Sequence, residues 1–158
     1  MALRELKKEL NRMDKTEIIK LILEMYKKVP DAKNYLEIFS TGDIKKLAEK
    51  YKKEIERYIY PNGRNMDLRE TEARKIIRTV RKMNITELNI ELELHYVSCC
   101  LKIIDDFGYS DESYYLAMGK MFDNAISGIH KQGFEEKYFE LIKSLSNKAS
   151  EFGIELEY

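Results

Sequence analysis

Residues 88–107 read LNIELELHYVSCCLKIIDDF, and this stretch decides the fold. From Leu88 to Tyr96 apolar and polar residues alternate, which is the pattern of a half-buried strand. The whole stretch also carries apolar residues at helical spacing over about five turns. Leucine and glutamate favour helices, and no turn residue divides the segment before Gly108. We therefore predict one long helix with a wide apolar band, which makes it the central helix of the protein; a strand over 88–97 is the alternative.

The flanking segments predict further helices. Residues 14–17 form a capping-box pattern, and Pro30 ends the helix that this box opens. Asp43 is the expected cap of a helix over 44–59, and Gly133 ends a later helix. The chain holds only 7 Gly and 2 Pro, few for a β-sandwich. The pattern predicts an all-α fold of about seven helices in antiparallel hairpins, arranged as a bundle or a HEAT-like right-handed stack.

The length of 158 residues predicts a single helical domain over 1–158, with a possible division into 1–60 and 68–158. The first residues are charged and do not resemble a signal peptide, and no long apolar run predicts a membrane span. Cys99 and Cys100 are adjacent and cannot join distant elements. We therefore expect a cytoplasmic protein that does not associate with membranes.

The two halves of the chain carry opposite charge. Residues 1–84 hold 22 basic and 14 acidic residues, a net charge of +8, whereas residues 85–158 hold 6 and 14, a net charge of −8. Seven cations cluster in the basic half: Arg64, Arg69, Arg74, Lys75, Arg78, Arg81 and Lys82. Three of these, Arg74, Arg78 and Arg81, fall on one helix face and could neutralise phosphates. Nucleic-acid binding through residues 64–82 is one hypothesis; a solvated helix face is the other, and we favour it.

A second candidate is the stripe of Glu91, His95 and Cys99, spaced four residues apart on the central helix. Histidine and cysteine can bind zinc, and a histidine can activate a thiolate. A zinc site, however, takes about four ligands, and a free cysteine is among the most buried residue types. We favour the interpretation that His95 and Cys99 are core residues, and we expect neither a metal nor another cofactor.

Tyrosine is abundant, with 11 residues in the chain and no tryptophan. Tyr109, Tyr114, Tyr115 and Tyr138 are candidates for a partner surface, because tyrosine combines a large contact area with a polar tip; the alternative is that they rim the core. No nucleotide-binding, metalloprotease or nucleophile motif occurs. We expect a protein that is not an enzyme and that binds another protein or forms a homo-oligomer.

Three segments resemble a bacterial family of unknown function, DUF6155. The first is the loop Tyr60-Pro61-Asn62-Gly63-Arg64 with the helix start that follows over 68–77, and the second is the Leu/Ile-rich helix from Lys15. The third is the pattern Tyr114-Tyr115 with Met121-Phe122 and Ala125. The loop is less basic than the family pattern, because Asn62 and Asn65 stand where basic residues are expected. The resemblance implies a fold and supplies no catalytic residues.

Overall fold

The computed structural model of the protein describes residues 2–60 and 66–158. Its described residues form helices and no strands, which confirms the predicted all-α class. The helices are α1 (Leu3–Leu10), α2 (Lys15–Lys28), α3 (Pro30–Thr41), α4 (Lys45–Ile59), α5 (Glu70–Arg81), α6 (Thr86–Phe107), α7 (Glu112–Gln132) and α8 (Glu135–Glu151). Eight helices are present in these ranges where about seven were predicted. Pro30 not only ends α2 but is the first residue of α3, a position that suits proline because the amide there needs no helical partner.

The ambiguous stretch forms a helix along its full length. At 22 residues α6 is the longest helix, and it buries both the residues of the strand-like alternation, such as Leu88 and Leu92, and later residues such as Ile103. It packs against α4, α5, α7 and α8. The prediction of a long central helix is therefore confirmed, and the strand alternative over 88–97 is wrong, because an apolar band this wide serves a helix with neighbours around most of its circumference.

The chain divides into two compact units, Met1–Asp43 and Ile44–Tyr158. The predicted single domain over 1–158 stays a prediction. The alternative division between residues 60 and 68 would separate α4 from α5 and α6, against which it packs.

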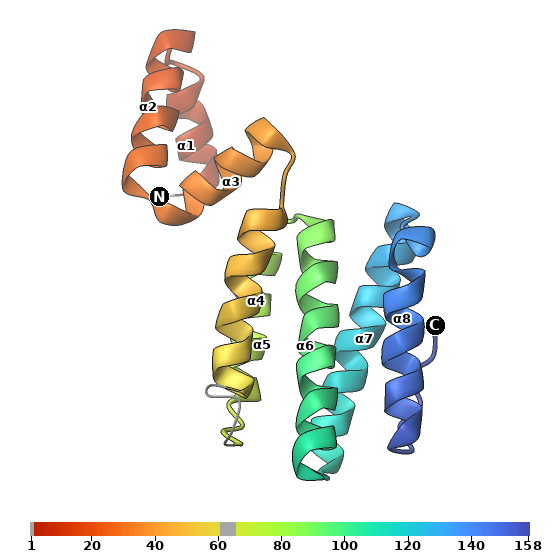
Figure 1. Ribbon diagram of the computed structural model, residues 1–158. Coiled ribbons are helices and arrows are strands. Elements are labelled where there is room, and N and C mark those ends of the chain that lie inside the picture. Colours follow the sequence, from red (N-terminus) through yellow and green to blue (C-terminus); the bar gives the residue numbers. More distant parts are fainter. Residues whose placement is uncertain (1, 61–65) are drawn as a thin grey trace. The chain divides into compact units, whose positions relative to one another are not determined.

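Within the second unit the helices form two layers. Figure 1 shows α4, α6 and α8 side by side, with α5 and α7 behind them, and successive helices run in opposite directions. Every buried residue in the described chain belongs to this unit, from Ile44 to Leu156. The core therefore lies between the two layers, with α6 at its centre.

The first unit has a different character. Its three helices contain no buried residue. The helix α2 packs against α3, where the Tyr26 hydroxyl donates to the Glu37 carboxylate over 3.0 Å. This contact, the Lys33 ammonium over the Tyr26 ring and half-buried apolar side chains hold α2 and α3 together.

Residues at the helix ends follow the predicted chemistry with one exception. Asp14 and the Glu17 backbone and side chain complete the capping box of α2, and Gly108 and Gly133 adopt the left-handed conformation that ends α6 and α7. Ile44 takes the N-cap position of α4. The predicted cap at Asp43 is thus misplaced by one residue.

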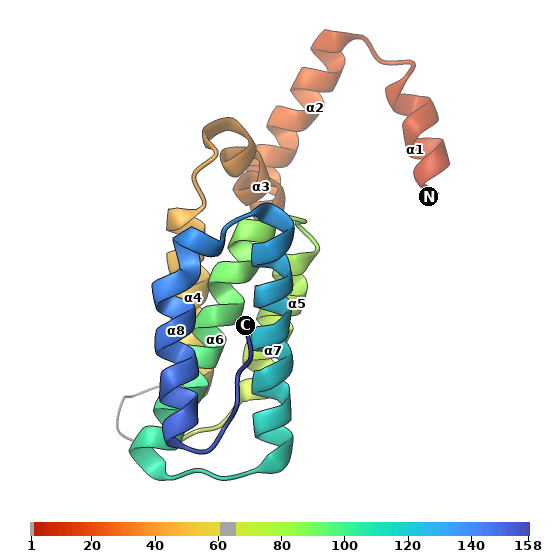
Figure 2. The same ribbon diagram turned by 90° about the vertical axis from the view of Figure 1, so that its right-hand side faces the viewer.

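After α8 the chain turns at Gly153 and runs back alongside this helix (Figure 2). Leu156 is buried there, and the Ser146 hydroxyl donates to its carbonyl over 2.8 Å. None of the helices in the described residues combines the length and the apolar composition that crossing a membrane requires.

Candidate functional sites

A basic groove lies between α5 and α7. It has a volume of about 330 Å³, and Arg74, Arg78 and Arg81 of α5 line it together with Lys120 of α7. The three arginines share one face because they are spaced by four and three residues. Lys120 faces them from the other helix, and the rest of the lining also comes from α7: Ser113, Leu116, Ala117, Met121 and Asn124. The structure thus brings together three of the seven predicted cations in a concave surface.

Two of the groove arginines donate hydrogen bonds to side chains of α6. Arg74 donates to the Tyr96 hydroxyl over 2.9 Å. Arg81 donates to one Glu93 carboxylate oxygen from two nitrogens, at 3.0 and 2.7 Å. Burial raises the pKa of Glu93 even though Arg81 opposes the shift. Arg78, which is exposed, lies between them along the helix. Two of the three guanidinium groups in the groove are therefore oriented by hydrogen bonds to α6.

The other predicted cations do not join this groove. Arg69 pairs with Asp67 at 3.0 Å, and Lys75 pairs with Glu72 at 2.7 Å. Lys82 is exposed beyond the end of α5. Arg64 lies outside the described residues. Sequence reasoning missed Lys120, because only the packing of α5 and α7 on α6 brings this residue opposite the arginines.

The four tyrosines divide into two pairs. Tyr114 and Tyr138 are each only 3% exposed. Tyr114 donates to the Cys100 carbonyl over 2.9 Å, and Tyr138 donates to the Glu91 carboxylate over 2.8 Å. These two tyrosines belong to the core, and side chains so little exposed offer no surface to a partner. Their hydroxyls have the hydrogen-bond partners that a buried tyrosine usually has. Tyr109 and Tyr115 are half-buried, and the Tyr115 hydroxyl donates to the Tyr109 carbonyl.

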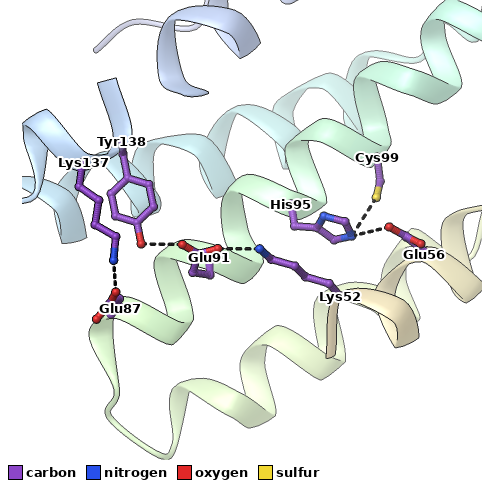
Figure 3. Close-up of polar contacts among 8 residues, drawn as sticks. All are labelled: Lys52, Glu56, Glu87, Glu91, His95, Cys99, Lys137 and Tyr138. Atoms are coloured by element: carbon purple, nitrogen blue, oxygen red, sulfur yellow. Dashed lines mark hydrogen bonds and ion pairs between the residues drawn. The ribbon is translucent and has the colours of Figure 1, made fainter. Parts of the chain in front are cut away.

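In the structure, Glu91 has different partners from His95 and Cys99, the other two residues of the predicted stripe on α6. Glu91 accepts hydrogen bonds from Lys52 of α4, at 2.6 Å, and from Tyr138 of α8 (Figure 3). Burial would raise the pKa of Glu91, but these two hydrogen bonds together with the positive charges of Lys52 and Lys137 hold the pKa below its ordinary value. Lys137 and Glu87 form a further ion pair beside this contact. Glu91 is therefore occupied in joining α4, α6 and α8.

His95 and Cys99 face a different carboxylate. The Nε2 atom of His95 lies 3.1 Å from a Glu56 carboxylate oxygen and 3.6 Å from the Cys99 sulfur (Figure 3). Burial is the main cause that lowers the pKa of His95, and it raises the pKa of Cys99 to about 12. The imidazole is thus neutral and the thiol protonated at neutral pH. Sequence reasoning missed Glu56, which lies 39 positions before His95 and reaches it only because α4 packs against α6.

The first unit exposes large apolar side chains. They include Leu3 and Leu6 on α1, Ile19, Ile22, Leu23 and Met25 on α2, and Tyr35 and Phe39 on α3. Ile19, Ile22 and Leu23 lie on one helix face by their spacing. The sequence pattern shows these residues as the apolar faces of helices but does not say whether they are covered.

Comparison with known proteins places the chain in a family without a known role. A family model described as "Family of unknown function (DUF6155)" matches residues 1–155. No curated protein matches the chain. No solved structure matches it either. The resemblance that the sequence motifs indicated is confirmed.

Proposed function

The chain belongs to the DUF6155 family, and since this family has no known function, we propose one from the residues: a non-catalytic protein that associates with a second copy of itself through its N-terminal helices. The observation that carries the proposal is that α1, α2 and α3 bury no residue. A helix keeps its place in a protein mainly through burial of its apolar face. A unit of this size without buried side chains therefore needs a partner surface.

The exposed face of α2 has the features of an interface. Ile22 is 41% and Leu23 53% exposed, and Phe39 of α3 reaches 80%. Burying a fully exposed apolar side chain stabilises an interface by about 1.5–3 kcal/mol, and the half-exposed Ile22 and Leu23 would each contribute about half of that. Lysine and glutamate residues surround the apolar positions and would form a polar rim.

Charge favours a second copy over a strongly charged partner. Residues 1–43 hold nine basic and eight acidic residues, a net charge of +1. Two such surfaces do not repel each other, and a two-fold axis can set the acids of one copy opposite the bases of the other. The free thiols Cys99 and Cys100 suit a reducing compartment, and we place the protein in the cytoplasm.

Light scattering over a series of protein concentrations tests this proposal. We expect the mass to rise from monomer to dimer, and Leu23→Glu to shift this transition to at least tenfold higher concentration, because it places a charge in the apolar contact. Lys27→Gln is the matched control: it lowers the net charge by the same single unit at an exposed position of α2 and should leave the transition unchanged. A monomer at every concentration would overturn the proposal.

The groove favours a second candidate function, binding of nucleic acid. Three arginines and Lys120 line one concave surface, and guanidinium groups bind phosphates through paired hydrogen bonds. Fluorescence anisotropy with DNA and RNA at two salt concentrations checks this function. Binding should weaken steeply with salt and be reduced in Arg78→Ala. Lys131→Ala, on the same helix as Lys120 but outside the groove, is the control. Absence of binding at low salt contradicts this function.

A further inference from the structure

Glu56, His95 and Cys99 bring three kinds of metal ligand to one point between α4 and α6. The carboxylate oxygen, the imidazole nitrogen and the thiol sulfur all lie within 4.8 Å of one another. His95 and Cys99 are one helical turn apart on α6, so their side chains leave the helix on the same face. Glu56 reaches them from α4. The folded protein therefore brings three candidate ligand atoms from two helices close together without a bound ion.

Two of the three separations are close to the edges of a zinc tetrahedron, and the third, from the Glu56 oxygen to the Cys99 sulfur, is within 4.8 Å. With Zn–N bonds of about 2.0 Å and Zn–S bonds of about 2.3 Å, tetrahedral angles set nitrogen and sulfur about 3.5 Å apart. The His95 nitrogen and the Cys99 sulfur are 3.6 Å apart. For nitrogen and a carboxylate oxygen the same geometry requires about 3.3 Å, and the corresponding distance from His95 to Glu56 is 3.1 Å. We propose that this cluster binds one Zn²⁺ ion, with Glu56, His95 and Cys99 as ligands and a water molecule at the fourth position.

The surroundings suit this ion. Imidazole, thiolate and carboxylate are all ligands that zinc uses in proteins, and zinc displaces the proton of a coordinating thiol. The Lys52 ammonium is directed to Glu91 at 2.6 Å (Figure 3), which offsets its charge beside the site. The Glu56 side chain is 53% exposed, so an ion can enter from solvent.

Titration of the tag-free protein with Co²⁺ tests the site. Cobalt bound to a thiolate gives a near-ultraviolet charge-transfer band and intense visible bands when four-coordinate, which report the thiolate and the geometry directly. We expect both signals at one equivalent, their loss on addition of Zn²⁺, and a rise in the unfolding temperature with Zn²⁺, since the ion joins α4 to α6.

The adjacent cysteines provide a matched pair of variants. Cys99→Ala should abolish the charge-transfer band, whereas Cys100→Ala, at the next position but outside the cluster, should keep it. His95→Gln should abolish binding, and His130→Gln should not, because His130 lies at the end of α7 beside Glu135. No band in the folded wild type, or a band that survives Cys99→Ala, would overturn the proposal.

Glu56→Gln tests the site even if the variants of the buried ligands fail to fold. Its side chain is more than half exposed, so the substitution leaves the core intact. We expect it to weaken Co²⁺ binding at least tenfold while circular dichroism stays that of the wild type. Unchanged affinity in this variant would remove Glu56 from the site and contradict the three-ligand geometry.

Discussion

The two units of this protein are built from similar helices but differ in what those helices cover. Both contain amphipathic helices, and in both an aspartate caps a long helix, Asp14 for α2 and Asp111 for α7. In the second unit α6 packs against four other helices and buries side chains on nearly all sides. In the first unit no side chain is buried. The comparison teaches that capping and periodicity suffice to form a helix, whereas a core requires a helix with several neighbours.

The largest expected effect on stability comes from comparing one phenylalanine in each unit. Phe122 is fully buried on α7, and Phe39 is 80% exposed on α3. Phe122→Ala should lower the free energy of unfolding by about 3–5 kcal/mol, since it removes buried contacts and leaves a cavity. Phe39→Ala should change it by less than about 0.5 kcal/mol. Urea unfolding followed by circular dichroism measures both, and similar losses in the two variants would show that the first unit has a core.

The next effect concerns the buried carboxylate of the second unit. Arg81→Met leaves Glu93, which is 3% exposed, without its cation. We expect a loss of about 1–3 kcal/mol, the cost of an unsatisfied buried acceptor. Arg78→Met, at an exposed position of the same helix, is the control and should be nearly neutral. Equal stability of the two variants in urea would mean that Glu93 does not depend on Arg81.

The raised pKa of Glu93 predicts a pH dependence with a definite sign. Burial, opposed by Arg81, makes the folded state hold this proton more tightly than the unfolded state does. The group therefore favours folding below its unfolded pKa of about 4.3, and this contribution is lost as pH rises through the folded pKa. The stability of the wild type relative to Glu93→Gln should fall as pH increases across this window. Urea midpoints measured over the window check this, with Glu140→Gln, at an exposed position, as the control; a relative stability that rises with pH would contradict it.

The smallest effect compares the two helix caps. Asp111 accepts a hydrogen bond from the Tyr114 amide over 2.9 Å, and Asp14 accepts one from the Glu17 amide over 2.8 Å. Asp111→Ala should lower the unfolding midpoint modestly, because α7 belongs to the cooperative core. Asp14→Ala should leave that midpoint unchanged and reduce only the helical circular dichroism signal. A lower midpoint in Asp14→Ala would indicate that α2 unfolds together with the core.

Local patterns allowed the helices and the arginine face to be predicted. The periodicity of residues 88–107 predicts α6, and glycines at 108 and 133 predict where two helices end. The spacing of Arg74, Arg78 and Arg81 predicts that they share a face. Each of these features depends on residues within one or two helical turns, where backbone geometry alone sets which side chains are neighbours.

Contacts between helices could not be predicted in the same way. Glu56 meets His95, and Lys120 faces the arginines, only after α4 and α7 have packed against α6. The same limit applied to Tyr114 and Tyr138, which are buried where α7 and α8 pack against α6 and whose hydroxyls donate to groups of α6. In α2 the apolar residues follow the same periodicity as in the core helices, but α2 buries none of its side chains.

Hydrogen exchange at two protein concentrations tests the central claim, that the second unit supports its own fold while the N-terminal helices depend on a second copy. We predict that the amides of α6 and α7 show strong protection at both concentrations. Those of α2 should exchange rapidly at low concentration and become protected as the concentration rises. Strong protection of α2 that is independent of concentration would contradict the account.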